Sequence, residues 1–325
     1  MIVDDRREVT MKNDDLRPFP SADPAEFDII DALLTHLPAL WSPAEESDAP
    51  GVNAFAVRDA WDALCGHGIS GLLVPTECGG QGASLSRSLS VAWALSRIPA
   101  PVPFLSTAII APLVAIALGE RGLLTEIATG DSVVAVAFGG RVEGDGEWDT
   151  VVHGEVTNVL HGIDADRWLV VARTAEDKVT LLAVDRPASA VREPGPDLTR
   201  PTARARFDGM SVRRLAEGVE PLVEEVVRRA HLVRCVEVLA AATVAASQDT
   251  AVLSAVSVAV TAVRSAAAAT DLHARCEQSQ LRLACDRTAT VARLVGDRRR
   301  GAGSLRSERC VQRATSASRW LPPVA

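Results

Sequence analysis

The most informative stretch of this chain reads Gly71-Leu72-Leu73-Val74-Pro75-Thr76-Glu77-Cys78-Gly79-Gly80-Gln81-Gly82. It runs from an apolar, strand-like tetrad through a proline turn into a glycine cluster, and an apolar helical pattern follows from Ser84 to Ser96. Gly79, Gly80 and Gly82 lack a Cβ, so the backbone here can take positive φ or pack closely against a neighbour or ligand. By itself, the stretch predicts a connection between two helices.

Two flanking segments place this stretch in a wider context. Trp61-Asp62-Ala63-Leu64-Cys65-Gly66-His67-Gly68 precedes it, and Pro99-Ala100-Pro101-Val102-Pro103-Phe104-Leu105-Ser106-Thr107 follows it. In this order the three segments resemble the N-terminal helical domain of the acyl-CoA dehydrogenase family. Members of that family are flavoenzymes that desaturate acyl thioesters between Cα and Cβ.

Length and composition indicate an ordinary globular protein of two or three domains. The chain has 325 residues, of which 47% are hydrophobic and 23% charged, so it can bury a substantial core and is not disordered as a whole. Its formal net charge is −8. Because nucleic-acid affinity needs a basic face, this balance argues against nucleic acid as a partner.

The cysteines and the N-terminal residues indicate the cellular compartment of the protein. No cysteine belongs to a CxxC pair or to a His/Cys cluster at metal-ligand spacing, so we expect no metal site. The first residues are polar and acidic and lack the apolar segment of a signal peptide. We also expect no apolar run long enough to span a bilayer. These features predict a cytoplasmic protein with reduced thiols, the six cysteines being Cys65, Cys78, Cys235, Cys276, Cys285 and Cys310.

Hydrophobic periodicity predicts an α-helical N-terminal domain over residues 26-130, after a mobile leader at residues 1-25. Apolar residues recur at helical spacing in five segments, which are separated by loops rich in proline, glycine and polar residues. Gly130 ends the last of these segments. The expected helices are Phe27–Leu40, Ala54–Cys65, Ser84–Arg97, Ser106–Ala117 and Leu123–Ala128.

The period changes near residue 130, and residues 131-218 predict a small β-domain. Short β-branched runs alternate with Gly, Pro and Asp turns, a spacing typical of a small antiparallel barrel or sandwich. Two segments resemble the central β-domain of the acyl-CoA dehydrogenases: Gly154 to Gly162, and Pro196-Asp197-Leu198-Thr199-Arg200. The expected strands are Ser132–Phe138, Val151–Val159, Trp168–Ala172, Val179–Val184 and Ala203–Phe207.

A third domain, over residues 219-325, is predicted to be helical but incomplete. The segment from Pro221 to Ser247 has helical periodicity and is similar to the helix that opens the family's C-terminal four-helix bundle. A helix also fits Val252 to Ala269, although its β-branched residues lack a clean apolar stripe. The fold class is therefore α+β: an N-terminal α-helical domain, a central small β-barrel or sandwich, and an incomplete C-terminal helical bundle.

Acyl-CoA oxidation needs a carboxylate that removes the α-proton, a flavin that accepts the β-hydride, and donors that polarise the thioester carbonyl. The resemblance implies a glutamate base in the C-terminal bundle and a Gln-Phe-Gly-Arg-type motif that contacts the cofactor. Neither is recognisable in the sequence after residue 245. Glu277 and Glu308 are the glutamates of that region, and both are interpreted as surface charges. The catalytic residue stays unknown.

The resemblance also implies candidate residues for binding FAD. Phe138-Gly139-Gly140-Arg141-Val142-Glu143 stands where the family commonly has Thr-Glu-Pro followed by a Gly-Ser pair, in a loop that faces the flavin. Leu160 and His161 stand where the family places residues against the flavin. Phe138, Gly139, Leu160 and His161 are therefore the cofactor-binding candidates. The simpler alternative for His161 is that it closes a β-turn before Gly162.

The resemblance leaves three functional hypotheses open. The chain is an acyl-CoA dehydrogenase that binds acyl-CoA and FAD and uses an unrecognised base. Alternatively, it is a non-catalytic subunit of a heteromeric acyl-CoA dehydrogenase, in which FAD is shared with a partner subunit that supplies the base. Thirdly, it is an inactive truncated copy, or one whose tail after about residue 246 is frameshifted. In that case the apolar faces of residues 222–240 are expected to be uncovered. The resemblance implies a homo- or hetero-oligomer with another acyl-CoA dehydrogenase subunit.

Overall fold

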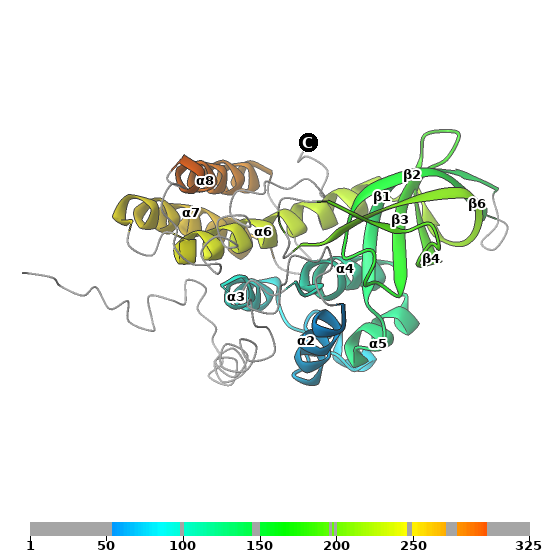
Figure 1. Cartoon of the computed structure of the whole chain (residues 1–325), viewed down its shortest axis with the longest axis horizontal. Coiled ribbons are helices and arrows are strands. Elements are labelled where there is room, and N and C mark those ends of the chain that lie inside the picture. Colours follow the sequence, from blue (N-terminus) through cyan, green and yellow to red (C-terminus); the bar gives the residue numbers. More distant parts are fainter. Residues whose placement is uncertain are drawn as a thin grey trace, which may run out of the picture.

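The computed structural model describes residues 54–97, 101–144, 150–194, 197, 200–245, 249–270 and 278–297. Within these ranges the chain is a mixture of helices and one six-stranded sheet (Figure 1), as the α+β assignment predicts. The expected leader at residues 1-25 and the helix Phe27–Leu40 lie outside the described residues. The domain boundaries themselves stay a prediction.

The helical pattern before residue 130 is confirmed from Ala54 onward. Ser84 begins one of these helices by accepting a hydrogen bond from the Arg87 backbone N–H, as N-cap serines do. The expected helix Ser106–Ala117 starts earlier, as a π-helical segment that continues into an α-helix. The elements are α2 (Ala54–Gly66), α3 (Leu85–Ser96), η4 (Phe104–Ile110), α4 (Ala111–Leu118) and α5 (Arg121–Thr129).

The glycine-rich stretch between α2 and α3, defined here as the 71–82 loop, contains no strand. Its apolar residues are buried in turns, and its only regular element is the short 3-10 helix η3 (Thr76–Cys78). The Gln81 N–H donates to the Gly71 carbonyl at 2.9 Å, and the Gly82 N–H donates to the Val74 carbonyl at 2.8 Å. The loop therefore folds back on itself through its own backbone.

The sheet contains the five expected strands and one short extra strand. The strand order is β2-β1-β3-β4-β6-β5, and β6 also pairs with β2, so the pairing returns to the first strand. The expectation of a purely antiparallel sheet is wrong, because β1 and β3 are parallel neighbours. The strands are β1 (Val134–Glu143), β2 (Thr150–Leu160), β3 (Arg167–Arg173), β4 (Val179–Asp185), β5 (Val191–Glu193) and β6 (Thr202–Glu217).

The inner face of the sheet is packed around two aromatic side chains. Trp168 and Phe207 are fully buried and meet edge to face, with ring centroids 6.5 Å apart and planes at 89°. The Trp168 indole N–H donates to the Gly162 carbonyl at 3.1 Å. On β6, Phe207 and the buried alanines alternate with exposed arginines, which is the period of two expected of a half-buried strand.

Three helices follow the sheet: α6 (Glu220–Ala245), α7 (Thr250–Ala268) and α8 (Gln278–Asp297). Figure 1 shows α6 extending from beside the sheet to the opposite end of the molecule, where α7 and α8 pack on it. The expectation that α7 lacks an apolar stripe is wrong, because its alanines complete one. The buried residues of α7 are Val252, Val256, Ala259, Val260, Val263, Ala266 and Ala267.

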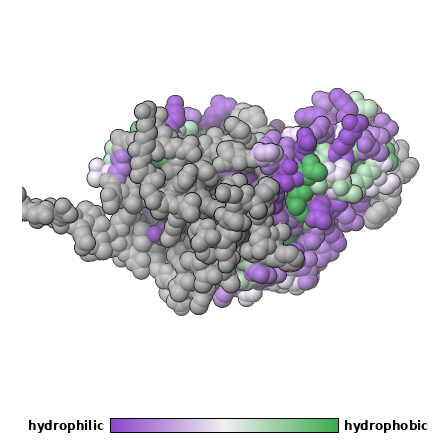
Figure 2. Space-filling model, viewed as in Figure 1, coloured by the Kyte–Doolittle hydropathy of each residue, from purple (hydrophilic) through white to green (hydrophobic). Residues whose placement is uncertain are grey.

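Helix α7 also corrects the expectation that no apolar run reaches membrane length. It has 19 residues and a mean hydropathy of 1.7, so length and composition alone would let it cross a membrane. Core helices of soluble proteins pass the same criterion, and α7 buries one face against α6 and α8. In the described part of the chain, the exposed large hydrophobic side chains are Val191, Val258 and Leu283. Figure 2 shows a mainly hydrophilic surface over the strands, with a small apolar patch at the left edge of that surface.

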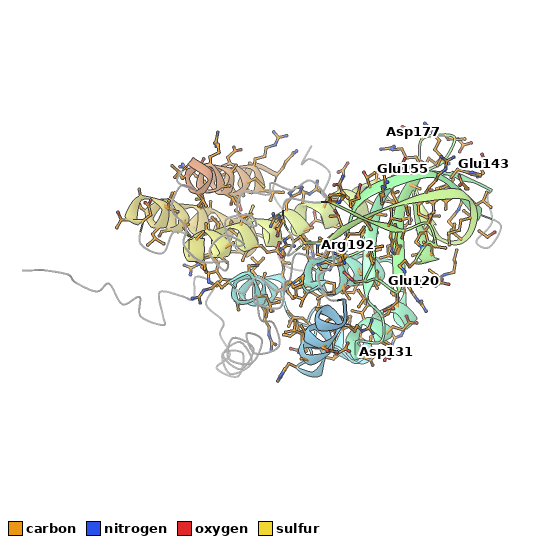
Figure 3. The ribbon with its side chains drawn as sticks, in the orientation of Figure 1. Glu120, Asp131, Glu143, Glu155, Asp177 and Arg192 are labelled. Carbon is orange, nitrogen blue, oxygen red and sulfur yellow. The ribbon has the colours of Figure 1, made fainter. Side chains whose placement is uncertain are left out.

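Charged contacts connect the helices to the sheet. Asp166, just before β3, pairs with Arg58 of α2 at 3.2 Å and accepts a hydrogen bond from the Val133 N–H at 2.9 Å. Arg213 of β6 pairs with Glu120, between α4 and α5, at 2.7 Å. Figure 3 shows Glu120 where these helices meet the strands. These contacts fix α2 and the connection between α4 and α5 beside the sheet. Helix α4 in turn forms one wall of the site described next.

Candidate functional site

The main candidate site is a pocket of about 630 Å³ between the 71–82 loop, α4 and the first turns of α6. A volume of this size is within the range of ligand sites in proteins. The lining is mostly apolar, with a few polar groups contributed by the loop and by α6. The lining residues are Leu73, Pro75, Thr76, Glu77, Gln81, Gly82, Leu113, Ile116, Ala117, Leu222, Glu225, Val226 and Arg229.

The loop wall of the pocket is held by hydrogen bonds to neighbouring backbone. The Gln81 side-chain amide donates to the Gly68 carbonyl at 2.9 Å, and Arg121 of α5 donates to the Glu77 carbonyl at 3.4 Å. A Cβ at Gly80 would overlap the carbonyl oxygen and Cβ of Val74. Only glycine therefore lets the two halves of the loop approach this closely.

The helix wall adds an ion pair to the pocket, whose loop wall carries the exposed carboxylate of Glu77. Leu222, Glu225, Val226 and Arg229 share one face of α6, because they are spaced three and four residues apart. The Arg229 Nε lies 2.7 Å from Glu225 Oε1, and Arg228 Nε lies 3.2 Å from Glu225 Oε2. The Arg229 side chain is only 6% exposed. An apolar pocket with one buried ion pair in its wall suits a ligand that has an apolar body and a polar end.

The sequence did carry a signal for this ion pair, which sequence reasoning missed. Glu225 and Arg229 are four residues apart on a predicted helix, the spacing at which opposite charges meet. What the sequence does not show is that α4 and the 71–82 loop cover the same face of α6. That covering turns a surface ion pair into part of a pocket wall.

Two of the four candidate flavin residues, Phe138 and Gly139, lie in β1. The segment from Phe138 to Glu143, expected to be a loop, is strand with a break in its register to β3 between Phe138 and Arg141. Gly139 has φ +135, and a Cβ there would lie 3.3 Å from Val156 Cγ1 of β2. Both residues are half-buried, so the Phe138 ring and the Gly139 backbone remain partly accessible where the register breaks.

The other two candidates, Leu160 and His161, are buried at the end of β2. They are 3% and 1% exposed. His161 has φ +54, and its N–H donates to the Pro201 carbonyl at 2.8 Å. Its carbonyl accepts from the N–H groups of Asp164 and Ala165 at 3.1 and 3.0 Å. The Gly162 N–H also donates to the Val159 carbonyl at 3.1 Å, so His161 lies in a turn that ends at Gly162, in agreement with the simpler alternative.

A side-chain contact ties His161 to the same turn. Its Nδ1 lies 3.3 Å from Asp164 Oδ2. Burial alone would raise the pKa of Asp164, but the hydrogen bond and charge of His161, with Arg192 and Arg186 nearby, lower that pKa below its ordinary value. Arg192 is labelled in Figure 3. The contact thus holds the turn, and it is an ion pair when His161 is protonated.

The residues present fit a flavin only in part. Phe138 and Gly139 offer accessible surface, whereas Leu160 and His161 face protein. None of the four lines the pocket between the 71–82 loop, α4 and α6. The structure therefore does not unite the four candidates into one site, and their role in cofactor binding stays a prediction.

Each carboxylate of α6 forms an ion pair or a hydrogen bond within the described part of the chain. Glu237 is buried between Arg200 and Arg234, and Glu225 is paired as above. Glu220 accepts the Val179 N–H at 2.8 Å, and Glu224 lies 3.6 Å from Arg228. Beyond α6, Asp249 caps α7, and Asp286 of α8 is exposed. Glu277 and Glu308 lie outside the described residues.

Among the described residues we find no candidate metal site. No group of three or more His, Cys, Asp or Glu side chains is placed to hold an ion in this part of the chain. Figure 3 shows Glu143 and Asp177, two of the labelled carboxylates, toward the outer end of the sheet. The pocket between the 71–82 loop, α4 and α6 remains the leading candidate for a ligand site.

Comparison with known proteins first gives a relationship in sequence. No family model matches the chain. The acyl-CoA dehydrogenase FadE34 of Mycobacterium tuberculosis is 32% identical over 135 residues, which are 39% of this chain and 18% of that protein. The match thus spans less than a fifth of the length of the curated relative.

Solved structures share the fold over nearly the whole chain. A structure described as the electron transferring flavoprotein of Acidaminococcus fermentans superposes with a TM-score of 0.74 at 15% identity, over 92% of this chain and 94% of that one. A glutaryl-CoA dehydrogenase from Mycobacterium smegmatis, in complex with FADH2, gives 0.70 at 14% identity, over 95% and 92%. The ChsE4-ChsE5 complex of Mycobacterium tuberculosis gives 0.68 at 18% identity, over 91% of each chain. At these identities the likeness shows the fold alone.

Proposed function

This chain is related to the acyl-CoA dehydrogenase family, and from that relationship we propose that it is a flavin-dependent subunit of a hetero-oligomeric acyl-CoA dehydrogenase. In this proposal the chain binds an acyl thioester and FAD, and a second dehydrogenase subunit supplies the carboxylate that removes the α-proton. The reaction is α,β-desaturation of the acyl-CoA. The proposed place of action is the cytoplasm.

The observation that carries the proposal is the engagement of every described carboxylate on α6. A general base must be within reach of the substrate and free to accept a proton. Glu225 is the pocket carboxylate of α6, and Arg228 and Arg229 neutralise it. Glu237 is buried between two arginines. Carboxylates held by arginines in this way are not free to approach a substrate proton, so a base from a partner explains the arrangement better.

A complex among the structural neighbours supports the same arrangement. The ChsE4-ChsE5 structure contains two differently named chains and shares the fold of this chain. A second neighbour, described as a Tcur3481-Tcur3483 steroid ACAD variant, also pairs two names, at a TM-score of 0.66. We extend this pairing to the present chain, with an oligomer built from it and another acyl-CoA dehydrogenase subunit.

The pocket and the irregularity in β1 have separate roles in the proposal. The apolar wall formed by Leu113, Ile116 and Leu222 holds the acyl portion, and the Glu225–Arg229 pair faces its polar end. Phe138 and Gly139 contact the flavin at the break in β1. When bound, FAD supplies the acceptor for the β-hydride. The chain itself binds, orients and excludes water from the substrate.

The inactive-copy hypothesis makes an expectation that differs from the observed packing. It expects the apolar faces of residues 222–240 to be uncovered. In the structure α3, α7 and α8 pack on α6, and the middle of α6 is buried on nearly all sides. The buried apolar residues of that region include Val226, Val227, Ala230, Leu232, Val233, Val236, Leu239 and Ala240.

Co-expression with a neighbouring dehydrogenase gene tests the proposed function. We expect the co-purified complex to show flavin absorbance and to reduce a dye with acyl-CoA, whereas the chain alone has at most a few per cent of that turnover. A lone chain that binds stoichiometric flavin and turns over at the rate of the complex would contradict the division of labour. A complex that stays colourless would contradict the flavin assignment.

A substitution in the pocket separates substrate binding from assembly. Ala117→Trp places a bulky ring in the pocket wall, and we expect it to raise KM for acyl-CoA at least tenfold in the complex with normal flavin content. Ala251→Trp, at an exposed position on α7, is the matched control and should leave KM unchanged. Equal KM values for the two variants would remove the pocket from the proposal.

A further inference from the structure

A pair of cysteines joins α6 to α8, the first and last of the three C-terminal helices. Cys235 of α6 and Cys285 of α8 have their Sγ atoms 3.7 Å apart. They are 50 residues apart in the sequence, so their meeting is a product of helix packing. Neither is in a disulfide in the structure. The interface that carries them is apolar, and Leu281 and Ala284 of α8 are fully buried in it.

The geometry places the two sulfurs in direct contact, at 3.7 Å. A disulfide has an S–S length of about 2.05 Å, so the sulfurs must approach by a little under 2 Å. Such an approach requires rotation of the two side chains or a small adjustment of α8 on α6. Cys235 is 5% exposed, whereas Cys285 is half-buried. A small oxidant therefore reaches Cys285 first and Cys235 then resolves it.

We propose that Cys235 and Cys285 are a redox site, at which a small peroxide converts the two thiols into a disulfide that clamps α8 to α6. The peroxide oxidises Cys285 to a sulfenic acid and leaves as water or an alcohol. The Cys235 sulfur then attacks that sulfur, and a second water leaves. A dithiol reductant restores both thiols. The two thiols thus lose two electrons and two protons, and the peroxide gains them.

The chemistry of the pair makes it a slow site. The hydrogen bond with Cys235 and burial both raise the pKa of Cys285 above its ordinary value. Because the thiolate is the reactive form, the pair stays reduced in a thiol-rich compartment and responds to sustained oxidation. This behaviour agrees with the expected reduced thiols of a cytoplasmic protein.

The clamp would act on the whole C-terminal helical region. The disulfide closes a loop that contains all of α7, because that helix lies between the two cysteines in the sequence. Closing a loop of about 50 residues restricts the unfolded chain and stabilises the folded one. We expect an increase in Tm of about 3–8 °C on oxidation. The inference does not depend on the proposed dehydrogenase function.

Peptide mapping of the full chain tests the proposal directly. The folded protein is treated with hydrogen peroxide, alkylated under denaturing conditions, and digested with trypsin. Arginines at positions 234, 264, 275, 282 and 287 place Cys235, Cys276 and Cys285 in three separate peptides. We expect a cross-linked species between the Cys235–Arg264 and Leu283–Arg287 peptides, lighter by two hydrogens than their sum and lost on reduction. Cross-links of Cys285 to Cys276 or Cys310, or full alkylation of both thiols after peroxide, would overturn the proposal.

Two variants test whether the Cys235–Cys285 disulfide causes the rise in Tm. Cys285→Ser removes one partner and should abolish the oxidation-dependent rise in Tm. Cys65→Ser, which removes another half-buried free thiol, is the control and should retain the rise. A wild-type protein that forms the cross-link without any change in Tm would contradict the clamp. The peptide map of the wild type keeps the proposal testable even if Cys285→Ser folds poorly.

Discussion

The 71–82 loop and helix α6 form opposite walls of one pocket, yet they are fixed in different ways. The loop is fixed by its own backbone: its N–H groups return to carbonyls of the same stretch, and Gly80 packs on Val74. Helix α6 is fixed by elements distant in sequence: α3, α7 and α8 pack on it, and Arg200 pairs with its buried Glu237. One wall depends on local geometry, and the other depends on residues distant in sequence.

Substitution of Gly80 should have the largest effect on stability, because it disrupts the close backbone packing of the 71–82 loop. A methyl group at Gly80 would overlap the backbone of Val74, and backbone cannot move aside as a flexible side chain does. We expect Gly80→Ala to lower the free energy of unfolding by more than about 3 kcal/mol, measured by urea denaturation. Gly66→Ala is the matched control, since a Cβ there meets nothing within 4 Å. It should change stability by less than about 1 kcal/mol. Similar losses for both would refute the close-packing argument.

Removal of Glu237 should have the next largest effect on stability, because it removes the ion pair that joins α6 to Arg200. Glu237→Ala leaves Arg200 and Arg234, both under 10% exposed, without their carboxylate. Breaking a buried ion pair from one side costs about 3 kcal/mol or somewhat more. The control is Glu224→Ala on the same helix, whose carboxylate is 62% exposed and whose loss should cost less than about 0.5 kcal/mol. A small loss for Glu237→Ala would mean that α6 is held by apolar packing alone.

Substitution of Glu225 should have a smaller effect on stability and a clearer one on ligand binding. Glu225→Gln keeps the size of the side chain but removes the charge opposite Arg229. We expect a loss of about 1–2 kcal/mol, from chemical denaturation, together with an altered acyl-CoA affinity by calorimetry. Glu225 faces the pocket, whereas Glu224 is exposed, so Glu224→Gln should change neither quantity.

The smallest predicted effect concerns pH and lies outside both walls, in the His161–Asp164 turn. The folded pKa of Asp164 is lowered from its ordinary value of 3.8. Its contribution is therefore present above about pH 4 and is lost as pH falls through the folded pKa. Wild type and Asp164→Asn should differ in unfolding free energy by up to about 1 kcal/mol near pH 6, and this difference should shrink as pH falls through the folded pKa of Asp164. A gap that stays constant would show that the contact is not ionic.

Sequence reasoning found most helices and strands, because each buries one face at a regular period. The expected Ala54–Cys65 and Val179–Val184 differ by a residue from α2 and β4. It missed β5, which is three residues long, and α8, whose arginine-rich pattern was not taken as helical. It also expected a loop at Phe138 to Glu143 where β1 continues. Short or interrupted elements give too few repeats for a period to be recognised.

Candidate site residues were harder to predict than the fold. Phe138, Gly139, Leu160 and His161 came from a resemblance, and the structure separates them into two accessible and two buried residues. The pocket was not predicted, although six of its lining residues lie in the 71–82 loop that the sequence singles out. A pocket needs walls from several elements, and sequence patterns describe one element at a time.

By itself, the sequence determined the local events: where helices begin, where glycines permit close backbone contact, and which side of each strand is apolar. Those properties depend on neighbours a few residues away. Tertiary structure alone decided that β1 lies parallel to β3, that Glu225 faces a pocket, and that Cys235 meets Cys285. Such contacts join residues far apart in the chain, so they form only once the packing of the apolar faces has fixed which elements are neighbours.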